Sequence, residues 1–254
     1  MDLRLTGKAA LVTGGTRGIG LAIARSLAAE GVSVTVCGRD QENLRQVCQA
    51  EALHGVVADV TVPEQLAAAV EAATDHSGRL DLLVANAGGS VGGSLLDSSY
   101  QDWEHTYRLN VLHAAHAVRC ATPHLEKRGG SVVIVSSITG WKPGPSSSYA
   151  STKAAEIHLA ATLAQELGRR GIRVNALSPG STLFPGGGWE SFGERFPDRL
   201  AAFAEQDFPA GRLVDIQQVA DVACFLLSDR ASGITGANIC VDGGQIQPSA
   251  GRFW

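Results

Sequence analysis

Tyr149 and Lys153 are a phenol and an ammonium that stand four residues apart in a segment with the composition of a helix. Side chains at this spacing lie on one face of a helix. A free tyrosine loses its proton at about pH 10, and a neighbouring cation favours the phenolate and lowers that pKa. The spacing therefore predicts a tyrosine that can act as a general acid or base. The same spacing is common on solvated helix faces, so the rest of the chain has to supply the context.

Residues 13–20 form a second candidate site, because they read Thr-Gly-Gly-Thr-Arg-Gly-Ile-Gly between an apolar run and a helical pattern. Glycine lets a pyrophosphate approach the N-terminus of the following helix, where unpaired N–H groups and the helix dipole favour an anion. The run therefore predicts a dinucleotide site. Its spacing, with Gly14, Gly18 and Gly20, departs from the common G-x-G-x-x-G pattern, and a turn with a purely structural role is the alternative.

The elements that must position these residues alternate between short apolar strands and helical patterns. Strands are expected at residues 8–13, 32–37, 55–58, 80–85, 131–135, 172–177 and 238–241, and helices at 21–30, 40–53, 63–76, a long region ending near 128, 149–170 and 215–227. Such alternation predicts an α/β fold with a parallel sheet covered by helices on both faces. Ligands then bind beyond the carboxyl ends of the strands, where the polar turns of the chain gather.

The composition is that of one globular domain. The 254 residues, 44% of them hydrophobic, contain no linker-like stretch, and the net charge of −4 with scattered cations argues against a nucleic-acid partner. No apolar run has the length of a signal-peptide core or a membrane span, so we expect a cytoplasmic protein without a membrane partner. The five cysteines, odd in number and without a C-x-x-C pair, are expected to be reduced and mostly buried thiols.

Residues 181–212 depart from the alternating pattern, and we expect them to form a lid segment that covers the substrate. The segment combines a Gly/Pro-rich stretch with several aromatic residues. Aromatic side chains could line the pocket of an apolar substrate, or they could pack the lid onto the core. The sequence leaves both interpretations open.

Several further motifs follow in order along nearly the whole chain, namely Asp59-Val60, Asn86-Ala87-Gly88, Asn110, Ser136-Ser137, Tyr149, Lys153 and Pro179-Gly180. Together with the glycine turn they resemble the short-chain dehydrogenase/reductase family, in its 3-oxoacyl-[acyl-carrier-protein] reductase-like branch. The resemblance implies a Rossmann-type doubly wound parallel sheet in three αβα layers, with residues 1–254 as a single NAD(P)-binding domain. It also implies a homo-oligomer, a tetramer or a dimer.

The resemblance implies a catalytic role for four residues. Tyr149 would exchange a proton with the oxygen of a carbonyl or alcohol, and Lys153 would lower the pKa of Tyr149 and bind the nicotinamide ribose. A serine hydroxyl would polarise the substrate oxygen, and Asn110 would hold a water that links Lys153 to solvent. The expected cofactor-binding residues are Gly14, Thr16, Arg17, Gly18, Ile19, Gly20, Arg39, Asp59, Val60, Asn86, Ala87, Gly88, Tyr149, Lys153, Pro179, Gly180 and Thr182.

Two neighbouring serines compete for the catalytic role. Ser137 stands in the S-S-x-x-G arrangement before Gly140, where the family has its catalytic serine second, and we choose it. Ser136 fits the family's usual distance to the tyrosine better and is the alternative. A second departure is Thr182, which follows Pro179-Gly180 in an unusual S-T-L-F-P-G-G-G-W context.

The choice of nicotinamide cofactor is argued from charge. A site for NAD(H) has a carboxylate after the second strand to bind the ribose 2′-hydroxyl, and a carboxylate would repel a 2′-phosphate. This chain has Cys37-Gly38-Arg39 there, and Arg39 with Arg17 could bind a phosphate through charge-assisted hydrogen bonds. NADP(H) is therefore favoured over NAD(H), unless a shifted loop presents Asp40 to the ribose.

These features favour an NADP(H)-dependent oxidoreductase that interconverts a small-molecule carbonyl and a secondary alcohol. The alternatives are an NAD-dependent polyol, sugar or alcohol dehydrogenase and a catalytically silent NADP-binding regulator. His113 and His116 stand at i,i+3 without a third ligand, so we expect packing or interface residues and no metal. Residues 247–254 could reach the site of a neighbouring subunit.

Overall fold

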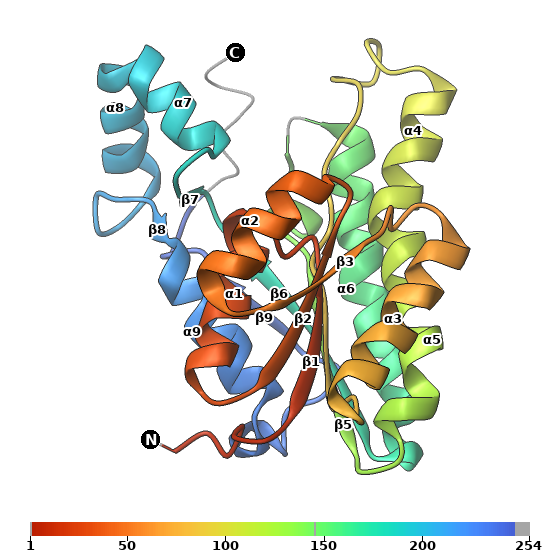
Figure 1. Cartoon of the computed structure of the whole chain (residues 1–254). Coiled ribbons are helices and arrows are strands. Elements are labelled where there is room, and N and C mark those ends of the chain that lie inside the picture. Colours follow the sequence, from red (N-terminus) through yellow and green to blue (C-terminus); the bar gives the residue numbers. More distant parts are fainter. Residues whose placement is uncertain (1, 145, 247–254) are drawn as a thin grey trace.

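Within the described residues, 2–144 and 146–246, the computed structural model has a central sheet of seven parallel strands in the order β3-β2-β1-β4-β5-β6-β9 (Figure 1). The strands are β1 (Ala9–Thr13), β2 (Ser33–Gly38), β3 (His54–Val57), β4 (Leu82–Ala85), β5 (Gly130–Val135), β6 (Ile172–Pro179) and β9 (Asn238–Val241). The strand order reverses between β1 and β4. A ligand crevice is expected there, beyond the carboxyl ends of these two strands.

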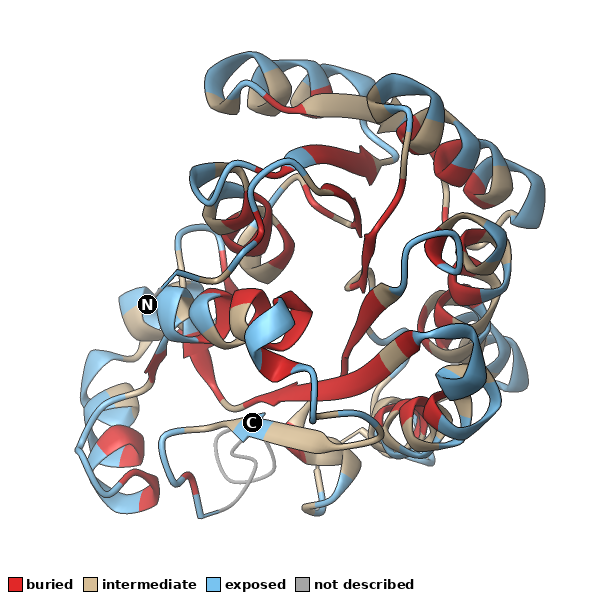
Figure 2. Cartoon of the chain, turned by 90° about the horizontal axis from the view of Figure 1, so that it is seen from below, coloured by how far each residue is buried: buried red, intermediate tan, exposed pale blue. Residues whose placement is uncertain are grey.

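Two apolar clusters cover the two faces of the sheet. Successive residues of β1 point to opposite faces, so that Val12 packs in one cluster and Leu11 in the other. On the first face lie α1 (Gly18–Ala29), α2 (Gln41–Glu51) and α9 (Ile216–Leu227), and on the second α3 (Pro63–Ser77), α5 (His113–Leu125) and α6 (Ser147–Leu167). Figure 2 shows the buried strands between the inward faces of the helices. The doubly wound, three-layer architecture predicted from the alternation is confirmed.

The helix that carries Tyr149 and Lys153 forms close to the expected bounds. α6 ends at Leu167, a 3₁₀ turn covers Gly168–Arg170, and Gly171 closes the segment with φ 73°. A residue with a Cβ would be strained in this left-handed conformation, which explains why the helical pattern stops at a glycine.

The predicted long helical region contains an irregularity at Asn110. α4 (Tyr100–Tyr107) and α5 are joined by a π-helical turn, Arg108–Leu112. The Asn110 side-chain amide donates a hydrogen bond of 2.7 Å to the Thr106 carbonyl, four residues earlier, which is the acceptor a regular helix would use for a backbone N–H. The wider turn follows from this competition.

The lid segment contains β7 (Thr182–Leu183), α7 (Gly188–Arg195), α8 (Pro197–Asp207) and β8 (Val214–Asp215), and its helices stand at the end of the molecule to which the strands point (Figure 1). Its aromatic side chains turn inward. Trp189 stacks on Phe203 with 4.8 Å between ring centroids, and Phe192, Phe203 and Phe208 are buried. These aromatics therefore pack the lid, and they give no support to an apolar substrate.

The cysteines are all free, but fewer are buried than expected. Cys37 and Cys224 are buried, Cys48 and Cys120 are half-buried, and Cys240 is exposed. Burial raises the pKa of the Cys37 thiol to about 11, so it stays protonated and inert at neutral pH. Within residues 2–144 and 146–246, no helix is long and apolar enough to cross a bilayer. The tail at residues 247–254 lies outside the described residues.

Candidate active site

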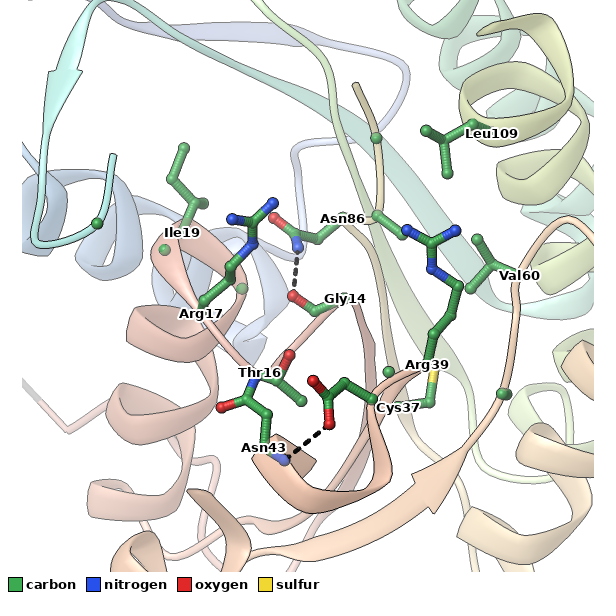
Figure 3. A pocket seen from close by; sticks show the side chains of 18 of the residues that line it. Gly14, Thr16, Arg17, Ile19, Cys37, Arg39, Asn43, Val60, Asn86 and Leu109 are labelled. Atoms are coloured by element: carbon green, nitrogen blue, oxygen red, sulfur yellow. Dashed lines mark hydrogen bonds between the residues drawn. The ribbon is translucent and has the colours of Figure 1, made fainter. Parts of the chain in front are cut away.

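A cleft of about 1050 Å³ opens beyond the carboxyl ends of β1, β2 and β4. It lies at the reversal of strand order, as the fold predicts. Most of the residues expected to bind the cofactor line it, namely Gly14, Thr16, Arg17, Gly18, Ile19, Gly20, Arg39, Asp59, Val60, Asn86, Ala87 and Gly88 (Figure 3).

The glycine turn offers unpaired backbone donors to this cleft. α1 begins at Gly18 with no side-chain cap and no acidic residue in its first turn. The first N–H groups of the helix and its dipole therefore face the cleft uncompensated, which is the donor set that a pyrophosphate requires. Gly18 has φ 53°, a conformation that a larger residue would adopt only with strain. The turn fits a dinucleotide cofactor.

Asn86 fastens the glycine turn to the neighbouring strand end. Its amide donates to the carbonyls of Thr13 and Gly14 at 3.0 and 3.1 Å, and a Cβ on Gly20 would collide with it. The Thr13 hydroxyl accepts from the backbone N–H groups of Asn86 and Ala87 at 3.0 and 3.2 Å. The Asn-Ala-Gly turn thus holds the shape of the cleft floor.

Two arginines flank the cleft where the second strand ends. Figure 3 shows Arg17 and Arg39 on opposite sides, with Thr16 and Asn43 between them. Arg39 is 71% exposed and only 3.8 Å from the Asp59 carboxylate. Asp40 also lines the cleft, and its carboxylate caps α2 by accepting from the Asn43 backbone N–H at 3.0 Å. The lining here combines the guanidinium groups of Arg17 and Arg39 with the carboxylates of Asp40 and Asp59.

Asp59 is held as a carboxylate at the edge of the cleft. Burial raises its pKa, but hydrogen bonds from the Thr61 backbone N–H and hydroxyl and the charge of Arg39 lower the pKa more. The Asp59 carboxylate is thereby oriented by its own turn. Asp59 and Val60 both line the cleft.

Lys153 lies buried behind the cleft wall, next to Tyr149. Its ammonium is 5.4 Å from the Tyr149 ring centroid and donates to the Val135 carbonyl at 3.0 Å and to the Glu156 carboxylate at 2.9 Å. A Cβ placed on Gly88 would lie 3.1 Å from the ammonium. Because Gly88 has no side chain, the ammonium lies close behind the part of the cleft wall that this glycine forms.

Asn110 is fully buried beside this ammonium. Its side chain accepts from the Gly89 N–H at 3.2 Å and donates to the carbonyls of Gly89 and Thr106 at 2.7 Å. These bonds tie the π-helical turn to the loop after β4. The role expected for Asn110 in holding a water stays a prediction.

The two serines at the end of β5 have different surroundings. Ser136 is buried, and its hydroxyl donates to the Lys153 carbonyl at 2.7 Å, so it fastens α6 to the sheet. Ser137 is half-buried, and its hydroxyl accepts from the Thr139 N–H at 3.2 Å, which leaves its own proton available to a substrate oxygen. This geometry favours Ser137 over Ser136.

Comparison with known proteins identifies the family of this chain. A family model described as Enoyl-(Acyl carrier protein) reductase matches residues 14–245. The 3-oxoacyl-[acyl-carrier-protein] reductase FabG of Thermotoga maritima is 36% identical over 251 residues, which cover 96% of this chain and 100% of the relative. The chain belongs to the short-chain dehydrogenase/reductase family. It is therefore an oxidoreductase, and its likeness to FabG agrees with the branch that the motifs resemble.

Two solved structures of the family have the same fold. The L-sorbose reductase of Gluconobacter frateurii, complexed with NADPH and L-sorbose, is 31% identical with a TM-score of 0.89, and the match covers 97% of this chain and 99% of that one. A 7α-hydroxysteroid dehydrogenase complexed with NADH is 32% identical with a TM-score of 0.87, and the match covers 97% of both chains. Relatives of this dehydrogenase/reductase thus bind either nicotinamide cofactor.

Five of the residues expected to bind the cofactor do not line the cleft described above, namely Tyr149, Lys153, Pro179, Gly180 and Thr182. Pro179 ends β6, and Gly180 packs against Asp242, whose Cα would lie 2.7 Å from a Cβ on that glycine. Thr182 is buried, and its hydroxyl donates to the Gly180 carbonyl at 3.0 Å. The Thr182 hydroxyl is thus used in a hydrogen bond within its own loop.

The cleft includes residues that the motifs did not indicate. Phe184 and Gly186–188 reach it from the lid, and a Cβ on Gly18 would lie 3.0 Å from the Phe184 ring. Asn43 and Leu109 complete the lining from α2 and the π-helical turn. The unusual S-T-L-F-P-G-G-G-W stretch was the available signal for Phe184, whereas nothing in the sequence separates Asn43 from other polar helix residues.

His113 and His116 are not arranged as metal ligands. His113 is buried, and its Nε2 lies 2.8 Å from the Thr13 hydroxyl, so it supports the strand end beneath the cleft. His116 Nε2 lies 3.1 Å from the Pro63 carbonyl. Among the described residues, no group of three His, Cys, Asp or Glu side chains could hold a metal.

Proposed function

We propose that this protein interconverts a small-molecule carbonyl and a secondary alcohol with NADP(H), and that Tyr149 is the general acid and base. The observation that carries the proposal is the buried Lys153 ammonium, 5.4 Å from the Tyr149 ring and directly behind the Gly88 wall of the cleft. A phenol with a fixed cation beside it can release and regain a proton. When bound, NADP(H) supplies or accepts the hydride.

The residues around the reacting oxygen divide the remaining work. In the direction of reduction, Tyr149 gives its proton to the carbonyl oxygen as the alcohol forms, and in oxidation it removes that proton. The Ser137 hydroxyl donates a hydrogen bond to the same oxygen and stabilises its developing charge. The Lys153 ammonium stabilises the phenolate that Tyr149 becomes.

The preference for NADP(H) over NAD(H) rests on charge at the end of β2. The Asp40 carboxylate caps α2, while the guanidinium of Arg39, 71% exposed and 3.8 Å from the Asp59 carboxylate, lines the cleft. A guanidinium binds a 2′-phosphate through two parallel hydrogen bonds, which a 2′-hydroxyl cannot accept. One solved relative binds NADPH and another binds NADH, so the fold alone does not decide the preference and the residues of each chain do.

Cofactor titration tests this preference. We expect the purified protein to bind NADPH more tightly than NADH, and Arg39→Asp to weaken NADPH binding by about 10- to 100-fold while NADH binding changes little. Arg45→Asp is the matched control, because Arg45 is exposed on α2, six residues after Arg39, but does not line the cleft. Tighter NADH binding by the wild type would contradict the proposal.

Turnover with a substrate panel tests the chemistry. NADPH oxidation would be followed with ketones, acyl thioesters, quinones and keto-sugars. Tyr149→Phe should abolish reduction and retain NADPH binding, whereas the control Tyr100→Phe, on an exposed residue, should retain both. Reduction by Tyr149→Phe at the wild-type rate would disprove the mechanism, and turnover by neither protein on any panel member would favour a silent NADP-binding regulator.

The same panel separates the two serines. Ser137→Ala should lower kcat by about 100-fold, because it removes a donor to the reacting oxygen. Ser136→Ala should leave kcat within about twofold, since its hydroxyl bonds to backbone inside the protein. The reverse result would move the catalytic role to Ser136.

The lid, the assembly and the location are proposals of the same kind. Residues 181–212 would cover the substrate, which is supported by the contribution of Phe184 and Gly186–188 to the cleft. A homo-oligomer, a tetramer or a dimer, is supported by the exposed Tyr100 and Leu112 on α4 and the π-helical turn. The proposed location is the cytoplasm. Light scattering of the purified protein measures the assembly directly.

A further inference from the structure

Glu156 forms an ion pair with Lys153 that is buried on both sides. The two charged atoms are 2.9 Å apart, and the side chains are 3% and 2% exposed for Lys153 and Glu156. Among the described residues, every other ion pair of a lysine or arginine has at least one side chain that is 14% exposed or more. Burying a carboxylate is unfavourable unless a partner compensates its charge. The position of this one, one turn beyond Lys153, therefore demands an explanation.

The carboxylate fixes the orientation of the Lys153 ammonium. An ammonium has three N–H donors. One goes to the Val135 carbonyl and one to Glu156, both directed into the protein. A single donor remains for the cleft side, where Gly88 and Tyr149 lie.

The other groups packed around the ammonium are neutral. Burial, together with the charge of Lys153, lowers the pKa of His113 to about 4, so this histidine is uncharged at neutral pH. Asn110 carries no charge, and the Ser136 hydroxyl lies against Glu156 and the Lys153 carbonyl. Of the described groups facing the ammonium, Glu156 and the phenolate of Tyr149 are therefore the ones that can carry negative charge.

We propose that Glu156 is a positioning residue that acts through Lys153, and that its buried negative charge sets the pH at which Tyr149 exchanges its proton. The inference rests on the function proposed for Tyr149. An ammonium without a counter-charge would favour the phenolate strongly, whereas the paired ammonium favours it less. Glu156 thereby keeps Tyr149 protonated to higher pH, which suits a residue that donates a proton to a carbonyl.

Tyrosinate absorbance in the near ultraviolet tests this without a substrate or a cofactor. The chain has three tyrosines, so the signal of Tyr149 is the difference between each protein and the same protein carrying Tyr149→Phe. Glu156→Gln keeps the shape and an acceptor but removes the charge, and it should shift the ionisation of Tyr149 by about one pH unit to lower pH. Glu166→Gln removes the same charge from the exposed part of α6 and should leave it unchanged.

The outcomes separate the proposal from its alternatives. An unchanged ionisation in Glu156→Gln, or a shift to higher pH, would overturn the role of the counter-charge. Because Glu156→Gln leaves a buried ammonium alone and could prevent folding, Lys153→Met and the double variant Lys153→Met/Glu156→Gln form a second test. Their Tyr149 ionisations should differ by less than those of the wild type and Glu156→Gln, because only the direct effect of the Glu156 charge remains without Lys153. An equal or larger difference would show that Glu156 acts without Lys153 and overturn the proposal.

Kinetics adds a readout that a merely structural role would not move. In wild-type protein that turns over, Glu156→Gln should shift the rising limb of the pH profile for alcohol oxidation to lower pH, with KM for the cofactor within about twofold. Absence of turnover by the wild type would contradict the proposed function. The absorbance titration would still decide the role of Glu156.

Discussion

The charges behind the cleft and the charges at its rim are arranged in opposite ways. Lys153 and Glu156 are buried and form an ion pair of 2.9 Å within the protein. Arg17 and Arg39 are exposed at the rim, and the carboxylate nearest to Arg39 is 3.8 Å away and engaged by Thr61. The buried charges thus have their partners within the protein, whereas the exposed arginines at the rim are open to solvent and to a ligand.

The difference shows where each kind of charge affects the protein. A buried charge contributes to both stability and reactivity, because its removal leaves a desolvated partner. An exposed charge is screened by solvent, so its removal changes ligand selection with little effect on folding. Substitutions in the two regions should therefore separate these quantities.

Removing Lys153 breaks the buried ion pair and should have the largest effect on stability. Lys153→Met leaves Glu156 as a buried carboxylate without a partner, and the free energy of unfolding at neutral pH should fall by about 3–5 kcal/mol. Burial raises the pKa of Glu156, and loss of the opposing attraction by Lys153 raises it further. Since the folded-state pKa then exceeds the unfolded one, the lost stability returns below about pH 4, where Glu156 is protonated in both states.

Urea unfolding at several pH values measures this loss. Lys127→Met is the control, since Lys127 is exposed and its removal should change the free energy of unfolding by less than about 0.5 kcal/mol. If Lys153→Met lost little free energy of unfolding and the loss did not vary with pH, Glu156 would not be a buried carboxylate in that variant.

His113 sharpens the comparison, because it is a titratable group buried in the same region. Its pKa is lowered by burial to about 4, against about 6.5 in the unfolded chain. The unfolded state therefore binds the proton first as pH falls, and His113 should remove about 3 kcal/mol of stability between neutral pH and pH 4. In acid unfolding experiments, the free energy of unfolding of His113→Gln should therefore fall less steeply with decreasing pH than that of the wild type. The exposed His158→Gln should decline like the wild type, and an equally steep decline in both variants would contradict the assignment.

Asp40 tests the rim with the smallest expected effect. Asp40→Ala removes the cap of α2 and should lower the free energy of unfolding by about 1 kcal/mol. The ratio of NADPH to NADH affinity should not change, while Asp40→Asn, which retains a capping side chain, should keep both stability and selectivity. A tenfold loss of NADH binding in Asp40→Ala would mean that this carboxylate faces the ribose.

Much of the fold follows from the sequence. Apolar runs, helical periodicity and glycine positions are local features, and they predict the strands, the glycine turn and the end of the helical segment at Gly171 because backbone geometry is set by neighbouring residues. The aromatic residues of the lid show the limit. Their types indicate burial or a substrate equally, and only the stacking of Trp189 on Phe203 reveals that they face inward.

The sequence by itself determined the alternating architecture, the cleft at the reversal of strand order, and the spacing of Tyr149 and Lys153. Tertiary structure alone decided which polar side chains form hydrogen bonds or ion pairs inside the protein. Ser136 is engaged by a carbonyl 17 residues away and Asn86 by one 73 residues away. Glu156 stands three residues from Lys153 in the sequence, but its surroundings include Ser136, which follows β5 and is 20 residues away. The energy of a charge depends on what surrounds it, and distant elements supply those surroundings.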